Sequence, residues 1–137
     1  MVEKRTSKAM ENRINVLIAD DDVDILRLLR MSLLREGYRV TTARDGAQAL
    51  DKIQSDRPDV LILDVMMPNL GGLDLLEKLK SQKNTEKLPV ILLTKKKSYK
   101  DIKTGYSFGA DFYITKPFKI SQVIEGIKIV TKSEGLT

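Results

Sequence analysis

A short apolar run over residues 60–63 is followed directly by a carboxylate, Asp64, and then by a turn-forming segment from Pro68 to Gly72. An uninterrupted apolar run of this length, preceded by Pro58, is typical of a strand buried on both faces of a parallel sheet. Ligands bind at the carboxyl ends of such strands, so Asp64 is a candidate functional residue. The alternative, that Asp64 only caps a turn or the next helix, stays open at this point.

The same pattern recurs along the chain. Residues 14–19 form an apolar run that ends at Asp20, residues 90–94 end in Thr94, and residues 112–115 end at Lys116, whereas residues 38–43 alternate like a more exposed strand. Helical periodicity separates the five runs, which predicts an α/β fold with a mostly parallel sheet. The degree of exposure makes the first, third and fourth strands central. We therefore expect a doubly wound, flavodoxin-like sheet of five parallel strands in the order 2-1-3-4-5, with five helices.

The expected helices have apolar residues at helical spacing. Asp22 or Asp24 caps the first helix and Gly37 ends it. Gly105 costs the helix over 100–108 about 1 kcal/mol of propensity, so we expect this helix to be the most mobile. The expected apolar faces are Ile25, Leu28, Leu29, Ser32 and Leu33 in the first helix, Ala47, Leu50 and Ile53 in the second, Leu73, Leu76 and Leu79 in the third, and Ile120, Val123, Ile124, Ile127 and Val130 in the last.

Length and composition restrict the possible chemistry. The chain has 137 residues, 42% of them hydrophobic, and contains neither Cys nor His. We expect one domain over residues 14–131, an N-terminal arm over 1–13 and a tail over 132–137. Thiolate catalysis, Cys-ligated zinc and a histidine base are excluded, which leaves carboxylates, hydroxyls and lysines, and a hard metal ion such as Mg²⁺ or Ca²⁺. No long apolar segment or signal core is present, so we expect a cytoplasmic protein without membrane contact.

Positive charge gathers in one short stretch. The net charge is +5, and Lys95, Lys96, Lys97, Lys100 and Lys103 lie close together in the sequence. A solvated surface is the favoured interpretation, and a partner with an acidic face is the alternative. Because few aromatic residues lie nearby, we expect no direct nucleic acid binding.

Strand order brings the candidate residues to one place. Asp20, Asp21 and Asp64 would meet at the switch point of the sheet, where their mutual repulsion favours a bound cation such as Mg²⁺. The backbone carbonyl of Met66 is well placed to join them. The hydroxyl of Thr94 and the ammonium of Lys116, at neighbouring strand ends, suit phosphoryl oxygens, and an Asp carboxylate can itself accept a phosphoryl group.

These residues resemble the receiver domain of two-component response regulators, of which the single-domain chemotaxis regulator is the familiar example. The resemblance spans residues 14–131 and is carried by the segments 17–22, 63–72, 92–94 and 113–118. It implies that Asp64 is the phosphoacceptor, that Asp20, Asp21, Asp64 and the Met66 carbonyl hold Mg²⁺, and that Thr94 and Lys116 bind the phosphoryl group. It also implies a cis peptide before Pro117 and a switch in which Thr94 and Tyr113 move together, reshaping the surface of the last two helices and the last strand.

The resemblance also implies partners and an output. A sensor histidine kinase or His-phosphotransfer protein would supply the phosphoryl group, and a downstream protein target would bind the activated chain, which would be a monomer or a weak dimer. The chain would be no enzyme beyond catalysing its own phosphorylation and dephosphorylation. Only residues 131–137 follow the last helix, so we expect no output domain unless the chain is an excerpt from a longer protein.

Some positions depart from the family pattern. Lys95 and Lys96 follow Thr94, where the family has a small residue, and Met66 is apolar at a position that tunes the lifetime of the phosphoryl group. One hypothesis is that a lysine here pairs with the phosphoryl group and hinders the hydrolytic water. The alternative function is a pseudo-receiver that binds partners without phosphorylation. A haloacid-dehalogenase-like phosphatase would need a second Asp where Met66 stands.

Overall fold

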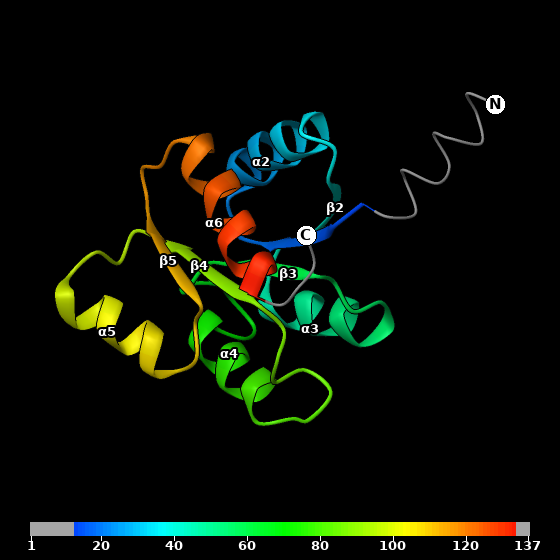
Figure 1. Ribbon diagram of the computed structural model, residues 1–137. Helices are drawn as coiled ribbons and strands as arrows, with labels where there is room; N and C mark the ends of the chain where they lie inside the picture. The colour runs from blue at the N-terminus through cyan, green and yellow to red at the C-terminus, as the bar shows by residue number, and fades with distance from the viewer. Residues whose placement is uncertain (1–12, 134–137) are drawn as a thin grey trace.

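The strands form where apolar and β-branched residues run together. The computed structural model describes residues 13–133 and contains one five-stranded sheet in which every neighbouring pair is parallel. The strand order is β2-β1-β3-β4-β5, which confirms the predicted topology (Figure 1). The strands are β1 (Asn15–Ala19), β2 (Arg39–Ala43), β3 (Val60–Leu63), β4 (Val90–Thr94) and β5 (Phe112–Thr115).

Three of the helices begin at polar side chains that cap them. Asp22 accepts hydrogen bonds from the backbone of the first turn of α2, Asp45 does the same for α3, and Ser98 for α5. These side chains satisfy amide groups that the first turn of a helix leaves without a partner. The helices are α2 (Val23–Arg35), α3 (Gly46–Ser55), α4 (Gly72–Lys80), α5 (Tyr99–Ser107) and α6 (Ile120–Ser133).

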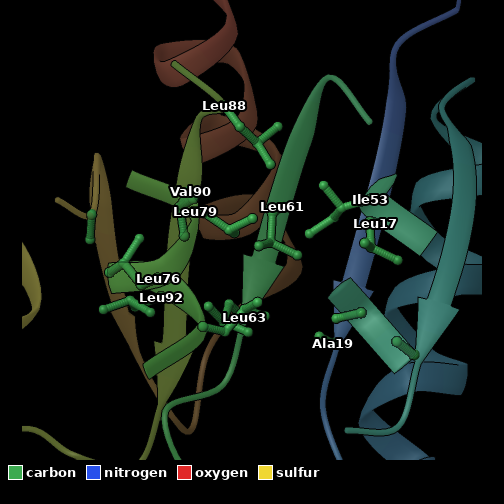
Figure 2. Packing of buried hydrophobic residues seen from close by; sticks show 14 residues of the cluster. Leu17, Ala19, Ile53, Leu61, Leu63, Leu76, Leu79, Leu88, Val90 and Leu92 are labelled. Carbon is green, nitrogen blue, oxygen red and sulfur yellow. The ribbon is translucent and has the colours of Figure 1, made fainter. Parts of the chain in front are cut away.

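Alternate residues of the strands point into two hydrophobic layers, one on each face of the sheet. Figure 2 shows one layer, in which Leu61 and Leu63 of β3 and Leu92 of β4 lie among residues of α3 and α4. The intervening residues, such as Ile62 and Ile91, point into the second layer, which α2 and α6 cover. Because both faces are covered, β3 and β4 are buried along their whole length. The apolar run before Asp64 is therefore the internal strand that its sequence predicted.

The predicted apolar face of α2 is partly wrong. The structure buries Leu26, Leu29 and Leu33, whereas Leu28 is 49% exposed and Ile25 is only half-buried. Residues 26, 29 and 33 lie one above another on a helix, so the buried stripe is rotated from the expected one. Leu28 is consequently available at the surface beside the candidate site.

Gly105 allows α5 to pack closely on the sheet. A Cβ atom at this position would lie 2.8 Å from Leu92 Cδ1 and 2.9 Å from Tyr113 Cδ2. The glycine thus lowers helix propensity but lets the helix approach β4 and β5, which the sequence pattern alone did not indicate.

The expected arm and tail lie largely outside the described residues. Residues 1–12 and 134–137 are not described, and α6 continues to Ser133, past the domain boundary expected at residue 131. Within residues 13–133, none of the helices combines the length and the apolar character needed to span a membrane.

Candidate functional site

The carboxyl ends of four strands surround one pocket. Its volume is about 210 Å³. The residues that line it are Asp21, Asp22, Asp64, Met66, Thr94, Lys95 and Lys116. They follow β1, β3, β4 and β5, which are adjacent in the sheet although far apart in the sequence. Strand order alone therefore assembles the candidate residues at one edge, where ligands bind in folds of this type.

Three carboxylates converge at this edge of the sheet. Oxygen atoms of Asp20, Asp21 and Asp64 all lie within 4.8 Å of one another. Asp20 and Asp64 are buried, and Asp21 is exposed at the mouth. Each buried carboxylate accepts a hydrogen bond from the backbone two residues further on, Asp20 from the Asp22 amide at 2.9 Å and Asp64 from the Met66 amide at 3.3 Å. These bonds fix the orientation of the acids, as Asx turns do.

One ammonium group forms ion pairs with both buried acids. Lys116 Nζ lies 2.7 Å from Asp20 Oδ2 and 3.2 Å from Asp64 Oδ2. The peptide bond between Lys116 and Pro117 is cis, as the resemblance implied. Among the described residues, Lys116 is the lysine that pairs with these acids, whereas Asp21 and Asp22 line the pocket without an ion pair, so the carboxylates outnumber the paired cation.

The pKa shifts in this cluster arise from burial and from the contacts between the charged groups. Burial raises the pKa of the Asp20 carboxyl, even though its bond to Lys116 acts in the opposite direction. Burial acts to lower the pKa of Lys116, but the hydrogen bond to Asp20 and the charges of Asp64 and Asp20 outweigh it and leave that pKa raised. The lysine thus stays charged, and its single charge does not fully compensate the desolvation of Asp20.

A backbone segment links Thr94 to Tyr113. The Lys96 amide donates to Thr94 Oγ1 at 3.4 Å, and the Lys96 carbonyl accepts a hydrogen bond from the Tyr113 hydroxyl at 2.6 Å. Thr94 is buried at the end of β4, whereas the ring of Tyr113 is half-buried and packs against the core. The sequence singled out Thr94 and Tyr113 but did not show that Lys96 joins them through its main chain.

Gly72 brings the turn after β3 close to Asp64. A Cβ atom on Gly72 would lie 2.1 Å from the Asp64 carbonyl oxygen, and the Gly72 amide donates to the Val65 carbonyl at 2.8 Å. Only glycine permits this approach of two backbone segments. The Pro/Gly turn therefore positions the candidate acceptor as well as starting α4.

The two lysines after Thr94 differ in placement. Both lysines are exposed, but only Lys95 is among the residues that line the pocket. Lys95 and Lys116 also line an adjacent groove of about 550 Å³, together with Ile25, Leu28 and Phe118. The sequence did not indicate this groove, because the periodicity of α2 had assigned Leu28 to the buried face.

Comparison with known proteins assigns the fold to a family. The sheet order, the helices on both faces and the acidic edge define a flavodoxin-like receiver fold. A model of the response regulator receiver domain matches residues 16–128. The chain therefore belongs to the response regulator receiver domain family, whose members act in phosphorylation-activated signalling and are not classical enzymes. A pseudo-receiver function finds no support in these comparisons.

Relatives and solved structures agree with this assignment. The chain is 40% identical over 124 residues to the probable transcriptional regulatory protein TcrX of Mycobacterium tuberculosis, covering 90% of this chain and 52% of TcrX. It is 40% identical over 119 residues to the response regulator MprA of Mycobacterium bovis, covering 87% and 51%. The chain thus spans about half the length of these curated relatives.

Among solved structures, the chain is similar to the receiver domain of the Francisella response regulator 1452. The TM-score is 0.83 and the identity 36%, with 89% of this chain and 99% of that one covered. It is also similar to the chemotaxis protein CheY4 of Vibrio cholerae, with a TM-score of 0.81, 32% identity, and coverage of 86% and 98%.

Proposed function

We propose that this chain is a signalling switch in which Asp64 accepts a phosphoryl group from the histidine of a sensor histidine kinase or a His-phosphotransfer protein. The observation that carries the proposal is the placement of Asp64, 7% exposed, on a pocket of about 210 Å³ and 3.2 Å from the Lys116 ammonium. A buried carboxylate next to a fixed cation can accept a group that arrives with negative charge.

The acidic cluster fits a magnesium ion, which receiver domains generally bind at an acidic pocket. The donor set consists of hard oxygens: the carboxylates of Asp20, Asp21 and Asp64, which lie within 4.8 Å of one another, and the Met66 carbonyl. Mg²⁺ prefers oxygen ligands and retains several waters, for which the exposed side of Asp21 leaves room. When bound, the ion would offset the negative charge of the acids and of the incoming phosphoryl oxygens.

Residues of the chain itself would carry out the other parts of the phosphoryl transfer. A carboxylate oxygen of Asp64 forms the new bond to phosphorus as the bond to the donor's histidine nitrogen breaks, and that nitrogen keeps the bonding electrons and takes up a proton. Lys116 holds charge opposite the phosphoryl oxygens, and Thr94 donates its hydroxyl to one of them. Lys116 would give up part of its hydrogen bonding to Asp20 and Asp64 and would contact the phosphoryl group instead.

The link through Lys96 supports a route from the site to the surface. If Thr94 turns toward a phosphoryl oxygen, the Lys96 amide loses its bond to Thr94 Oγ1, and the loop whose carbonyl binds Tyr113 is free to shift. The ring of Tyr113, on β5, then packs differently against α5, which changes the surface that a downstream protein reads. The output is proposed to be binding of a protein target, because no basic reading helix was found in the sequence. TcrX is titled a transcriptional regulatory protein, and this chain matches only about half of it.

Phosphorylation with a phosphohistidine donor tests the proposal. Purified chain is incubated with Mg²⁺ and a phosphorylated His-phosphotransfer protein, and intact mass spectrometry follows the gain of one phosphoryl group. Wild type and Asp74→Asn, which alters an exposed acid in the first turn of α4, should be labelled, whereas Asp64→Asn should not. Equal labelling of Asp64→Asn, or labelling that does not depend on Mg²⁺, would contradict the proposed site.

A further inference from the structure

The loop over residues 64–71 joins β3 to α4 and carries part of the candidate site. Met66 lines the pocket, and its amide donates to Asp64 Oδ1 at 3.3 Å. In the proposed function the carbonyl of Met66 is a ligand of Mg²⁺, and it is the ligand that lies farthest along this loop. The conformation of the loop therefore determines where one of the proposed ligands lies.

The loop contains a strained turn at Asn69. This residue has a φ of 69°, and it is the one non-glycine residue with a positive φ among residues 13–133. The Leu70 amide donates to the Pro68 carbonyl at 2.8 Å, which closes a three-residue turn around Asn69. A three-residue turn whose central residue has a positive φ is rare, and strained backbone persists only where surrounding contacts hold it. The turn therefore depends on contacts with another part of the fold.

The contact that holds Asn69 comes from the start of α3. Asn69 Nδ2 donates to Asp45 Oδ2 at 2.8 Å, and the other oxygen of this carboxylate accepts from the Gln48 amide at 2.8 Å. Asp45 is thus both the N-cap of α3 and the partner of the turn. The hydrogen bonds from Gln48 and Asn69 lower the pKa of the Asp45 carboxyl, so its charged form makes both bonds at neutral pH.

Gly46, the residue after this cap, allows the loop to lie against α3. A Cβ atom on Gly46 would overlap the Leu70 carbonyl oxygen and would lie 2.7 Å from Leu70 Cβ. The side chain of Leu70 packs against the hydrophobic layer on this side of the sheet. The turn is therefore held by an element that is distant in the sequence, since Asp45 and Asn69 are 24 positions apart.

We propose that Asp45 is a positioning residue for the magnesium site, which acts through Asn69 by holding the loop that carries the Met66 carbonyl. Asp45 itself is not among the residues that line the pocket. A loop that is already held in place needs less ordering when the ion binds, so the affinity for Mg²⁺ is higher than with a loose loop. The inference deepens the proposed function and rests on it, because it concerns the same magnesium site.

An exchange of the two side chains tests this role. Asn69→Asp places a second carboxylate opposite Asp45 and should break the hydrogen bond, while Asp tolerates a positive φ much as Asn does. In Asp45→Asn/Asn69→Asp the amide introduced at position 45 can donate to the carboxylate introduced at position 69, and its oxygen can still cap α3. The Kd for Mg²⁺ is measured by an NMR titration that follows the backbone amides of residues 64–71. We expect a Kd about three- to tenfold higher in Asn69→Asp, and a Kd within about twofold of wild type in the exchange variant.

Two further variants separate positioning from charge and from the shape of the turn. Gln54→Glu adds the same negative charge at an exposed position on α3 and should leave the Kd unchanged. Asn69→Gly permits the positive φ without the side chain and should also bind Mg²⁺ about threefold or more weakly. Urea denaturation in the presence of EDTA checks that each variant is folded under the conditions of the titration.

The inference is overturned if Asn69→Asp and Asn69→Gly bind Mg²⁺ as wild type does, or if the exchange variant binds as weakly as Asn69→Asp. Should an aspartate variant fail to fold, Asn69→Gly decides, and wild-type affinity in that variant overturns the inference. Failure of the proposed function gives a different result. Wild type without any Mg²⁺ response contradicts the magnesium site itself, whereas a wild-type response that both Asn69 variants retain overturns only the role of Asp45.

Discussion

Lys116 contacts both buried acids of the candidate site. Under the proposed function, residues near it would influence how long a phosphoryl group remains on Asp64. Lys95 lines the same pocket, whereas Lys96 acts through its main chain and keeps its side chain in solvent. The hypothesis that a lysine after Thr94 shields the phosphoryl group therefore narrows to Lys95. Met66 also lines the pocket, and this apolar residue is 61% exposed.

Lys95→Ala should speed loss of the phosphoryl group from Asp64. Removing one partly exposed charged contact is worth about 0.5–1 kcal/mol, which corresponds to a rate about two- to fivefold faster. Dephosphorylation is followed by mass spectrometry after the phosphodonor is removed. Lys96→Ala serves as the matched control and should decay at the wild-type rate; equal acceleration in both variants would show that the side chain of Lys95 has no special role.

Tyr113 should make stability fall with rising pH in the alkaline range. Burial, with the negative charges of Asp101 and Asp64, raises the pKa of Tyr113 to about 12. The ordinary value is about 10, so between these values the unfolded chain loses this proton first and folding is weakened as the pH rises. Urea denaturation at about pH 9 and about pH 11 measures the free energy of unfolding at each pH. Between the two, this free energy should decrease less for Tyr113→Phe than for wild type. The control variant Tyr99→Phe, at a position that is 81% exposed, should show the same decrease in the free energy of unfolding as wild type.

The turn between β3 and α4 contains two glycines, one of which lies against the backbone of Asp64. Gly71 and Gly72 are adjacent in sequence but differ in what surrounds them. A Cβ atom on Gly71 would make only ordinary contacts, the nearest at 3.7 Å, whereas one on Gly72 would meet the Asp64 carbonyl oxygen at 2.1 Å. The backbone of Asp64 cannot move away freely, because its amide donates to the Ala19 carbonyl within the sheet.

Gly72→Ala should destabilise the domain far more than Gly71→Ala. The clash is between backbone atoms, so we expect Gly72→Ala to lower the free energy of unfolding by about 2 kcal/mol or more beyond the effect of Gly71→Ala. Chemical denaturation of the two variants measures the difference. Similar stabilities would mean that the turn relaxes without disturbing β3.

At the scale of the whole molecule, the acidic cluster should couple ion binding to folding. Asp20, Asp21 and Asp64 come from the ends of β1 and β3 and meet only in the folded chain. An ion that binds this cluster therefore stabilises the native state by mass action. The unfolded chain holds these carboxylates too far apart to compete.

Mg²⁺ should raise the melting temperature of the unphosphorylated protein. At ten times the Kd the stabilisation is about 1.4 kcal/mol, or ~4 °C for a domain of this size. Thermal denaturation followed by circular dichroism, with and without Mg²⁺, checks this. Asp21→Asn should lose the response, while Asp74→Asn, outside the cluster, should retain it; an unchanged response in Asp21→Asn would remove Asp21 from the site.

Much of the fold follows from local patterns. The bounds of β3, β4 and β5 agree with the predicted strands. For β3 and β4 the reason is that a strand buried on both faces is marked by an unbroken apolar run. Asp22, one of the two residues predicted as the cap, caps α2, since a capping side chain acts on its own neighbours. The meeting of Asp20, Asp21 and Asp64 could be predicted as well, because strand order in this fold determines which strand ends are adjacent.

Contacts between helices and strands determine structural features that local sequence patterns do not specify. The periodicity of α2 allows several rotations, and only its contacts with the sheet select Leu26 over Leu28 for burial. Gly105 weakens its helix when considered alone, yet the ring of Tyr113 and the side chain of Leu92 leave no room for a larger residue. The bond from Tyr113 to the Lys96 carbonyl joins residues 17 positions apart. The sequence by itself thus determined the strands, their order and the acids at their ends. Contacts between elements determined the rotation of α2, the close approach of α5 to the sheet and the link between Thr94 and Tyr113.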